Sequence, residues 1–285
     1  MNPDLLLIAF PAADDEALYW WRVADGAVQG AGCDPDPRAA SQTDGPDEAQ
    51  ADIRVVALIA SHLTMIMAHE AISDVTDNQA LAAASMTAKA NSLDSANLHI
   101  VATMDDAGAV VTASVGRDIL SAGLVRLQAL ELDPDAIIPS GWLLPGTGDG
   151  AVSADFGFDQ VIRADNLIAT DDPALREILF ADQAIVPVTG DAFDAMLAGA
   201  SEKCDLNFRS GPFAKKTRRA MDARKSGQRR TRARPAAGRR EPRQYHVPGS
   251  GFGALFRAAT GPERIDYPHG LWRERDRVGD IVRCP

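Results

Sequence analysis

The sequence predicts a mixed α/β fold with a helix laid on one face of a sheet. Two short β-branched runs, Leu98–Thr103 and Ala109–Val115, flank Asp105-Asp106-Ala107-Gly108, a turn sequence typical of a hairpin. Arg117-Asp118 then begin a helix in which isoleucine and leucine recur every three or four residues. The apolar run Ala136–Leu144 follows as a buried strand. This order of strand, strand, helix and strand is typical of a mixed α/β domain.

The predicted helix after Arg117 carries its apolar residues on one side. Asp133-Pro134 is expected to end it, because proline forces the residue before it out of the α region. The apolar positions are Ile119, Leu120, Leu124, Leu127 and Leu130.

The N-terminal part predicts strands joined by turns, with an acidic loop rich in proline and alanine over residues 31–52. A start of strand, turn, strand, turn and strand is typical of ribonuclease H-like and actin-like domains. The expected strands are Leu5–Phe10, Ala17–Val23, Ala27–Gly30, Ile53–Ala60 and Leu63–Ala68.

Helix signals appear twice more. Thr76-Asp77-Asn78-Gln79 is a capping box that begins an alanine-rich helix ending near Asn91. Asp172-Pro173 combines an N-cap with proline at the first helical position, and Leu175, Ile178 and Leu179 follow. The other expected elements are strands at Val152–Phe158, Gln160–Ala164, Asn166–Ala169 and Ile185–Val188, and a helix at Asp191–Ala200.

Charge divides the chain into unlike parts. Residues 1–206 contain 9 Lys/Arg against 33 Asp/Glu, whereas residues 207–285 contain 20 against 7. Such a change indicates a boundary near Leu206. We therefore expect an acidic domain over 1–206, a basic segment over 207–225, and a basic, largely disordered tail over 226–285.

Targeting signals are weak throughout. The start, Met-Asn-Pro-Asp followed by six apolar residues, lacks the basic start and longer apolar stretch of a signal peptide. No window reaches the roughly 20 apolar residues that span a bilayer. From the chain alone we expect a cytosolic protein.

Two stretches resemble a known family. The run GRDILSAGLVRLQALELDPDAIIPSGWLLP, residues 116–145, resembles the cytoplasmic domain of protein L of the type II (general) secretion pathway. Leu206-Asn207, followed by Gly211 and Phe213-Ala214 and then by basic residues, is similar to the point where that protein approaches the membrane. The resemblance covers roughly residues 1–225 and implies an actin-like (ribonuclease H-like) α/β domain.

The same resemblance implies a function. The resemblance implies that the protein is a non-enzymatic platform component of the inner membrane without a cofactor. Such a component docks the cytoplasmic secretion ATPase (protein E) and couples it to the pseudopilus machinery. It also implies platform proteins M and F as partners, a homodimer, and a place at the cytoplasmic face of the inner membrane. The membrane helix and periplasmic domain that follow in the family do not follow here, and a frameshift or truncation after about residue 224 is our explanation.

The basic segment is the predicted membrane-proximal site. From Lys215 to Arg243 there are 13 basic and two acidic residues, without an aromatic residue. This pattern is typical of a cytoplasmic segment beside a membrane helix, and it is also typical of a segment that binds anionic lipid. Nucleic-acid binding is a third alternative, although stacking residues are lacking and the acidic domain would repel phosphate, so we expect no nucleic-acid partner. The named positions are Lys215, Lys216, Arg218, Arg219, Arg224 and Lys225.

The competing enzymatic hypothesis is an actin-like ATPase or a sugar-kinase-like enzyme. Asp155-Phe156-Gly157 follows a strand and could be a magnesium loop, but the motifs of a protein kinase are missing. The first strand–turn, Phe10–Asp14, has no glycine to let backbone approach phosphate. PGTGDG, residues 145–150, lacks the ending of a phosphate loop. We therefore expect no intact nucleotide site.

Remaining candidates are single residues. His62 and His69-Glu70 do not form a zinc motif, and Cys204 lacks an identified histidine partner, so no metal or catalytic residue is predicted. Trp20 and Trp21 are adjacent on a strand and face opposite sides. We expect one in the core and the other as an exposed anchor for a partner.

Overall fold

A computed structural model describes residues 4–11, 17–40, 53–71, 74–104, 108–146, 150–165, 167–181 and 183–216. The strands are β1 (Leu5–Ala9), β2 (Leu18–Ala24), β3 (Ala27–Asp34), β4 (Arg54–Ile59), β5 (Thr64–His69), β6 (Leu98–Met104), β7 (Val110–Gly116), β8 (Ala136–Pro139), β9 (Ala151–Asp155), β10 (Gln160–Ala164), β11 (Leu167–Thr170) and β12 (Ile185–Pro187). The helices are α1 (Pro37–Ala40), α2 (Asp77–Ala90), α3 (Arg117–Ala129), α4 (Pro173–Leu179) and α5 (Asp191–Ala198), with 3-10 turns η2 (Ser61–Leu63), η3 (Ser140–Leu143), η4 (Gly199–Glu202) and η5 (Gly211–Phe213).

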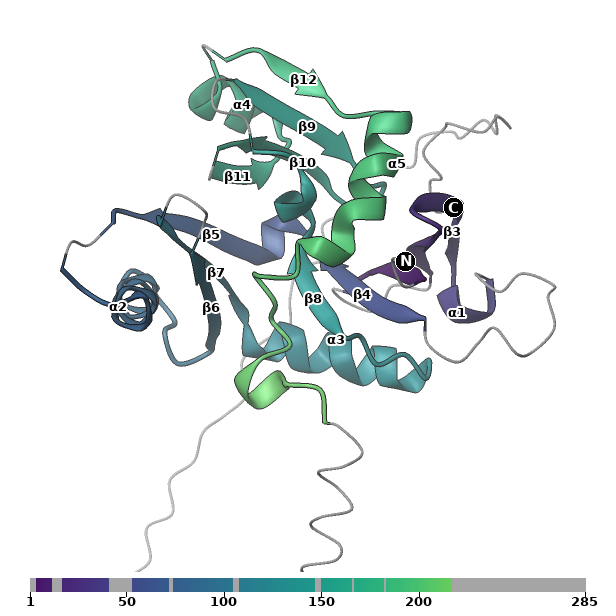
Figure 1. Ribbon diagram of the computed structural model, residues 1–285, viewed down its shortest axis with the longest axis horizontal. Coiled ribbons are helices and arrows are strands. Elements are labelled where there is room, and N and C mark those ends of the chain that lie inside the picture. The colour runs from purple at the N-terminus through teal and green to yellow at the C-terminus, as the bar shows by residue number, and fades with distance from the viewer. Residues whose placement is uncertain are drawn as a thin grey trace, which may run out of the picture. The chain divides into compact units, whose positions relative to one another are not determined.

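The first sheet has the strand order β3-β2-β1-β4-β8 (Figure 1). β1 pairs antiparallel with β2 and parallel with β4, and β4 pairs parallel with β8. Every residue of β1 is buried, as expected for a central strand with a parallel neighbour and both faces covered. An antiparallel three-strand start followed by parallel strands beside β1 is the ribonuclease H-like order, so the predicted fold class is confirmed.

The second sheet repeats this order. Its strands run β11-β10-β9-β12, with β9–β10 and β10–β11 antiparallel and β12 parallel to β9. β9, β10, β11 and β12 therefore occupy the places that β1, β2, β3 and β4 hold in the first sheet. Two such sheets in one chain are what an actin-like fold requires.

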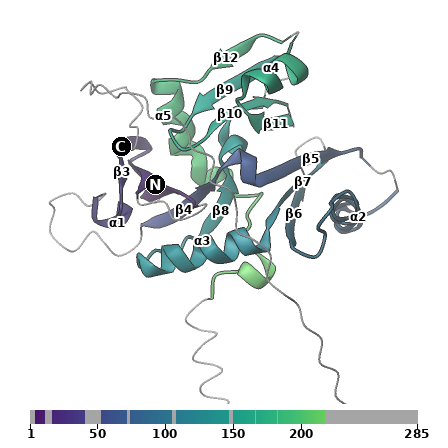
Figure 2. The ribbon, with the colours of Figure 1, turned by 180° about the vertical axis from the view of Figure 1, so that it is seen from behind.

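The third sheet, β5-β7-β6, lies between β4 and β8 in the sequence. The predicted hairpin is confirmed by antiparallel pairing of β6 with β7 from Leu98–Gly116 to Met104–Val110; its turn residues 105–107 lie outside the described residues. α2 packs against β6 and β7 (Figure 2). The capping box of Thr76 and Gln79 is present, and the helix buries only alanines. Leu93, just after the helix, is fully exposed.

Two hydrophobic clusters cover the two faces of the first sheet. Side chains alternate across a strand, so Leu6 and Ile8 enter one cluster and Leu5 and Leu7 the other. The expectation of an exposed tryptophan is wrong: Trp20 is 8% exposed in the first cluster and Trp21 is 7% exposed in the second. The second sheet and α5 supply the cover over Trp21, and the sequence around the tryptophans carries no sign of it.

α3 lies across the first cluster with Leu120 and Leu127 fully buried. Gly123 is required there because the ring of Phe10 occupies the space that a Cβ would need. The predicted boundaries need three corrections. β3 continues to Asp34 and α1 follows at Pro37–Ala40, within the loop expected over residues 31–52, of which residues 41–52 lie outside the described residues. α3 ends at Ala129, before Pro134, with Glu131 at φ +56° turning the chain. The strand expected over 136–144 stops at Pro139, and η3 follows.

Candidate functional site

The carboxyl edge of the first sheet is the place where an open α/β sheet binds ligands. Ser61 follows β4 there and Ser140 follows β8. Both meet Asp159, from the β9–β10 hairpin of the second sheet. Its carboxylate accepts hydrogen bonds from the Ser61 amide at 2.8 Å, from Ser61 Oγ at 2.8 Å, and from Ser140 Oγ. Asp159 is 4% exposed and Ser140 is fully buried.

This buried network joins the two sheets with the chain's own polar groups. A buried carboxylate is tolerable only when donors satisfy its oxygens, and the two serines provide three donors. Thr170 Oγ1, at the end of β11, lies 3.3 Å from Ser61 Oγ and extends the network. The carboxyl edge is thus closed by internal hydrogen bonds that hold the two sheets together.

The Asp155-Phe156-Gly157 candidate forms the hairpin between β9 and β10. Asp155 Oδ1 accepts from the Gly157 amide at 2.7 Å, and its Oδ2 accepts from Gln160 Nε2 at 3.1 Å. Gly157 has φ +82°, and a Cβ there would collide with the ring of Tyr19. The motif is therefore a tight turn shaped to pack on β2.

Aromatic rings fill the region between this hairpin and β2. Phe158 lies 6.2 Å from Tyr19 and 6.3 Å from Trp21, and Phe156 lies 6.3 Å from Trp21, all between ring centroids. Phe193 of α5 adds a contact of 5.3 Å with Phe156. A phosphate-binding loop needs backbone amides and small residues at the ligand. The β9–β10 hairpin presents apolar rings instead.

Two of the single-residue candidates, His69 and Cys204, have structural partners. His69 ends β5, and its Nε2 is hydrogen-bonded to Thr112 Oγ1 at 2.8 Å. Cys204 donates weakly to the Ala200 carbonyl at 3.5 Å, and burial raises the pKa of its thiol, which disfavours a nucleophilic thiolate. Within the part of the chain that the structure describes, no three His, Cys, Asp or Glu side chains are grouped to hold a metal ion.

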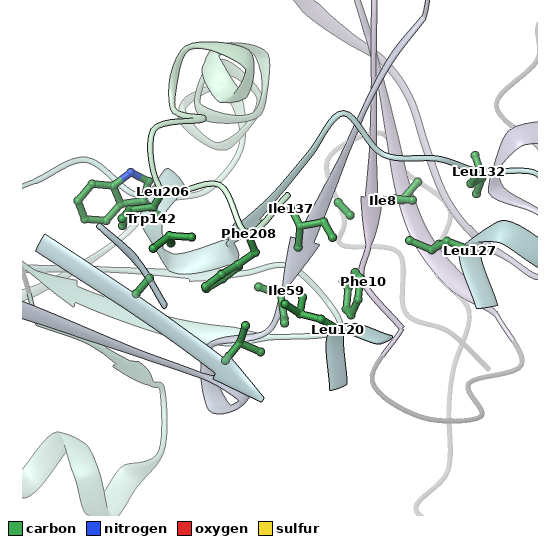
Figure 3. Packing of buried hydrophobic residues seen from close by; sticks show 14 of the residues in the cluster. Ile8, Phe10, Ile59, Leu120, Leu127, Leu132, Ile137, Trp142, Leu206 and Phe208 are labelled. Atoms are coloured by element: carbon green, nitrogen blue, oxygen red, sulfur yellow. The ribbon is translucent and has the colours of Figure 1, made fainter. Parts of the chain in front are cut away.

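A second feature, which we call the exit segment, comprises residues 205–215 and follows η4. Leu206 and Phe208 are fully buried in the first hydrophobic cluster, with Ile59 and Ile137 beside Phe208 (Figure 3). Trp142 Nε1 donates to Asp205 Oδ1 at 2.9 Å. Residue 206, where the charge balance changes, therefore lies inside the packed body, which continues to Lys215.

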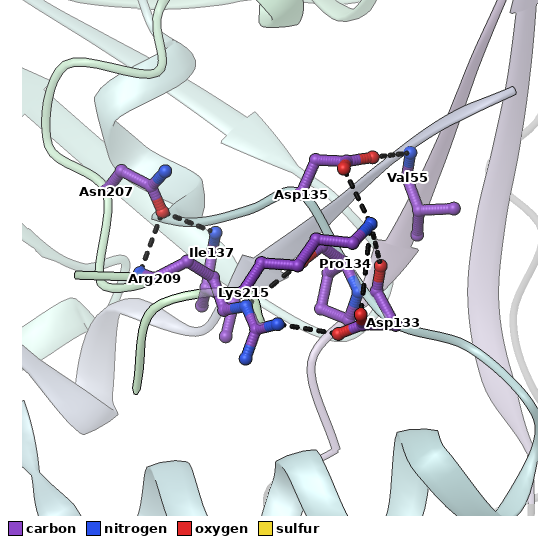
Figure 4. Close-up of polar contacts among 8 residues, drawn as sticks. All are labelled: Val55, Asp133, Pro134, Asp135, Ile137, Asn207, Arg209 and Lys215. Atoms are coloured by element: carbon purple, nitrogen blue, oxygen red, sulfur yellow. Dashed lines mark hydrogen bonds and ion pairs between the residues drawn. The ribbon is translucent and has the colours of Figure 1, made fainter. Parts of the chain in front are cut away.

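The exit segment is hydrogen-bonded to the edge of β8. The Phe208 amide donates to the Ile137 carbonyl at 2.8 Å. Asn207 Oδ1 accepts from the Ile137 amide at 3.0 Å and from the Arg209 amide at 2.8 Å (Figure 4). The asparagine side chain thus replaces a backbone acceptor at the edge of β8, which explains why this residue type is needed there.

Basic residues of the exit segment bind the acidic turn before β8. Arg209 Nε donates to the Pro134 carbonyl at 3.0 Å, and its Nη2 lies 2.6 Å from Asp133 Oδ1. Lys215 Nζ lies 2.9 Å from the Asp133 carbonyl oxygen and 2.6 Å from Asp135 Oδ1 (Figure 4). The Leu-Asp-Pro-Asp turn and the Leu-Asn motif, recognised separately in the sequence, are therefore two sides of one contact.

His99 of β6 also holds the exit segment. Its Nε2 donates to the Phe208 carbonyl at 3.0 Å and lies 3.2 Å from Ser210 Oγ, while the Phe213 ring packs on it at 5.0 Å. Burial lowers the pKa of His99, the Phe208 bond opposes that shift, and the charge of Arg117 adds to it. Sequence analysis missed this residue, although a histidine within the apolar run LHIVAT was a visible signal.

Of the predicted membrane-proximal residues, Lys215 takes part in the contact just described and Lys216 is exposed immediately after it. Arg218, Arg219, Arg224 and Lys225 lie outside the described residues. Among the helices that the structure describes, none has the length and apolar character needed to cross a bilayer.

These features define an actin-like α/β domain whose two sheets are joined by the buried Asp159 network and whose last segment is fastened to the first sheet. No family model matches the sequence, and no curated protein matches it. Among solved structures, the chain is similar to the cytoplasmic domain of EpsL, an inner membrane component of the type II secretion system of Vibrio cholerae. The identity is 15%, over 74% of this chain and 99% of that chain, with a TM-score of 0.58.

Two further similarities are more distant. A Bacteroides thetaiotaomicron protein with an actin-like ATPase fold and unknown function matches at 9% identity over 72% of this chain and 89% of its own, with a TM-score of 0.36. The PilM–PilN type IV pilus biogenesis complex matches at 14% identity over 80% and 76%, with a TM-score of 0.39. The EpsL match confirms the fold that the two sequence motifs predicted.

Proposed function

We propose that this chain is the cytoplasmic platform domain of a type II secretion protein L. In this role it seats the cytoplasmic secretion ATPase, protein E, and couples it to the pseudopilus machinery. The observation that carries the proposal is that the fold matched by the EpsL domain is the one implied by the two sequence motifs. The EpsL domain is matched over 99% of its length, and the two stretches that resemble protein L contact each other through Asn207, Arg209 and Lys215.

We also propose that the domain works without catalysis. Asp155 is bound by Gly157 and Gln160, and Asp159 by Ser61 and Ser140, so both carboxylates near the carboxyl edge serve the fold. The aromatic rings beside them would oppose a charged phosphate, because burying it there would cost its hydration without compensating donors. The work of the domain is then mechanical: to hold a partner in a fixed orientation.

The exit segment sets where the chain leaves the domain. Lys215 is the last residue of this segment that contacts the domain, and it is also the first residue of the basic run. We propose that residues 207–225 are the membrane-proximal segment that keeps the domain at the cytoplasmic face of the inner membrane. Each Lys or Arg near an anionic surface contributes about 1 kcal/mol. Proteins M and F and a second copy of the chain are the further partners of this proposal, and residues 226–285 remain our candidate for an aberrant tail.

Co-purification with the pathway's ATPase tests the proposal. The full chain, tagged and immobilised, should retain the ATPase, and calorimetry should give a dissociation constant at or below the micromolar range. A parallel titration with Mg-ATP should produce no heat of binding. Failure to retain the ATPase at micromolar concentrations would reject the docking role, and saturable binding of Mg-ATP would favour the actin-like ATPase instead.

A further inference from the structure

The third sheet ends at β6, whose outer edge pairs with no other strand among the described residues (Figure 1). β6 is antiparallel to β7, and the backbone groups of such a strand point alternately toward and away from its neighbour. The Arg117 amide donates to the Asn97 carbonyl at 2.7 Å across this ladder, so Asn97 points toward β7. The next residue and every second residue after it therefore point away. These outward residues are Leu98, Ile100, Ala102 and Met104.

Most of this edge is without a hydrogen-bond partner in the part of the chain that the structure describes. The Leu98 carbonyl accepts from Arg117 Nε at 2.9 Å, which closes the first position. The outward amides and carbonyls of Ile100, Ala102 and Met104 have no such bond. All three residues are half-exposed, so their backbone groups lie at the surface of the domain.

The other edge strands of the three sheets carry protection that β6 lacks. β12 has three residues and ends in Pro187, β11 has four residues, and β8 is hydrogen-bonded to the exit segment. β3 has a register shift in its pairing with β2 and contacts α1 and α5, and β5 contacts β11. Shortness, proline, bulges and covering segments are the means by which natural proteins keep edge strands from pairing. β6 has seven residues, LHIVATM, without proline, Asp, Glu, Lys or Arg.

The charge of the domain indicates which strand occupies this edge. Residues 1–206 contain 9 Lys/Arg against 33 Asp/Glu, so two copies of the domain repel each other over most of their surface. The strands β5, β6 and β7 contain none of these four residue types. A contact between two copies is therefore least opposed at the third sheet. A basic partner attracted by the acidic domain would find no acidic side chain on these strands.

We propose that two copies of this chain pair through β6, so that β5-β7-β6 of one copy continues into β6-β7-β5 of the second. The two β6 strands run antiparallel about a two-fold axis at Ala102, because the contact of a symmetric dimer uses the same surface on both copies. Ile100 then lies opposite Met104 of the second copy, and about six backbone hydrogen bonds form, two for each hydrogen-bonded pair. The inference deepens the proposed function, which includes a second copy as a partner, and it rests on that part of it.

The position of α2 agrees with this pairing. The helix packs on one face of the sheet, across β6 and β7, through Ala80 and Ala84. A two-fold axis normal to the sheet places the helices of both copies on the same face. Because neighbouring strands are about 4.8 Å apart, helices that lie between β6 and β7 come to about 10 Å from each other, which is the spacing of packed helices. The alanine-rich sequence of α2 permits this approach, because its side chains are small.

Sedimentation velocity over a concentration series tests the pairing with the full chain and two proline variants. Ala102→Pro removes an outward amide of β6 that the fold itself does not use. Ala68→Pro is the matched control, because it removes an outward amide at the opposite edge of the same sheet, on β5. We expect a dimer of the wild type at micromolar concentrations, a dissociation constant at least about tenfold weaker for Ala102→Pro, and a change below about twofold for Ala68→Pro.

Cysteine cross-linking tests the register without a proline. The Cα atoms of a hydrogen-bonded antiparallel pair lie about 5.5 Å apart, which is within the range of a disulfide. Ala102→Cys, at the axis, should therefore form a covalent dimer with oxidised glutathione as the oxidant, seen on a non-reducing gel. Ala68→Cys and the wild type, which carries Cys33, Cys204 and Cys284, should remain uncrosslinked under the same conditions.

Two results would overturn the pairing. The first is a wild type that stays monomeric up to about 100 µM. The second is a dimer that Ala102→Pro leaves unchanged and that Ala102→Cys does not cross-link, since the contact would then lie elsewhere. If Ala102→Pro does not fold, as judged by circular dichroism, the cross-linking of Ala102→Cys decides. None of these measurements contains the ATPase, so failure of the pairing leaves the docking role to its own test.

Discussion

The first and second sheets share one strand order and have opposite surroundings. In the first, β4 lies between β1 and β8 and its last four residues are buried. In the second, β12 takes the corresponding place, yet among the described residues no strand pairs with its outer edge, and Val186 and Pro187 are exposed. The difference teaches that the same topology serves two purposes. The first sheet is closed by β8 and the exit segment, whereas the second sheet ends at the exposed strand β12.

Phe208→Ala should have the largest effect, because it removes a fully buried ring from the closure of the first sheet. We expect a loss of about 3–5 kcal/mol in the free energy of unfolding, measured by urea denaturation. Phe213→Ala is the matched control, since Phe213 only packs against the same cluster from outside. A loss below about 0.5 kcal/mol for Phe208→Ala, as for a surface substitution, would mean that the exit segment contributes no more than a surface contact.

Asp159→Ala should rank second. It leaves the Ser61 amide and the hydroxyls of Ser61 and Ser140 without their buried acceptor, at a cost of about 3 kcal/mol. Asp155→Ala removes a carboxylate from the same hairpin, bound by Gly157 and Gln160, and should cost about 1 kcal/mol. Urea denaturation of both variants compares them. If Asp159→Ala is the milder change, the network does not join the sheets.

The hold of His99 on the exit segment should depend on pH. Its pKa is lowered in the folded state from an ordinary value of 6.5, mainly by burial. The unfolded chain therefore binds a proton more readily, and the free energy of unfolding should fall as the pH drops below about 6.5, by at most about 1.4 kcal/mol per pH unit. Above that pH the effect is absent. Urea titrations at several pH values should show this slope in the wild type and a smaller slope in His99→Gln. Identical slopes would exclude His99 as its source.

Ile178→Glu, on α4, should have the smallest effect on stability. Ile178 is exposed, and substitutions at such positions change the free energy of unfolding by about 0.5 kcal/mol or less. Thermal and urea denaturation measure it. A loss comparable to that of Phe208→Ala would show that α4 is covered in the isolated chain, and the contrast between the two sheets would disappear.

Local signals predicted the elements well, because they depend on neighbours in the sequence. The capping box at Thr76 and the cap at Asp172 both begin helices at the expected residues. The sequence did not predict burial and hydrogen bonds that depend on residues far away in the chain. Trp21 is covered by Phe156 and Phe158, and Ser61 meets Asp159 from 98 positions away.

The candidate site was predictable in part. Both motifs of the exit contact were visible in the sequence, but their contact, such as Ile137 with Asn207 across 70 positions, was not. The helix at Pro173 was predicted with its residues Leu175, Ile178 and Leu179, but the sequence did not tell that none of them is buried.

Hydrogen exchange of the full chain, with and without the secretion ATPase, tests most directly the claim that the folded domain seats this partner. We predict that the ATPase slows exchange at surface amides within residues 4–216 and leaves the buried strands β1 and β8 unchanged. Exchange that is the same in the two samples would contradict the account.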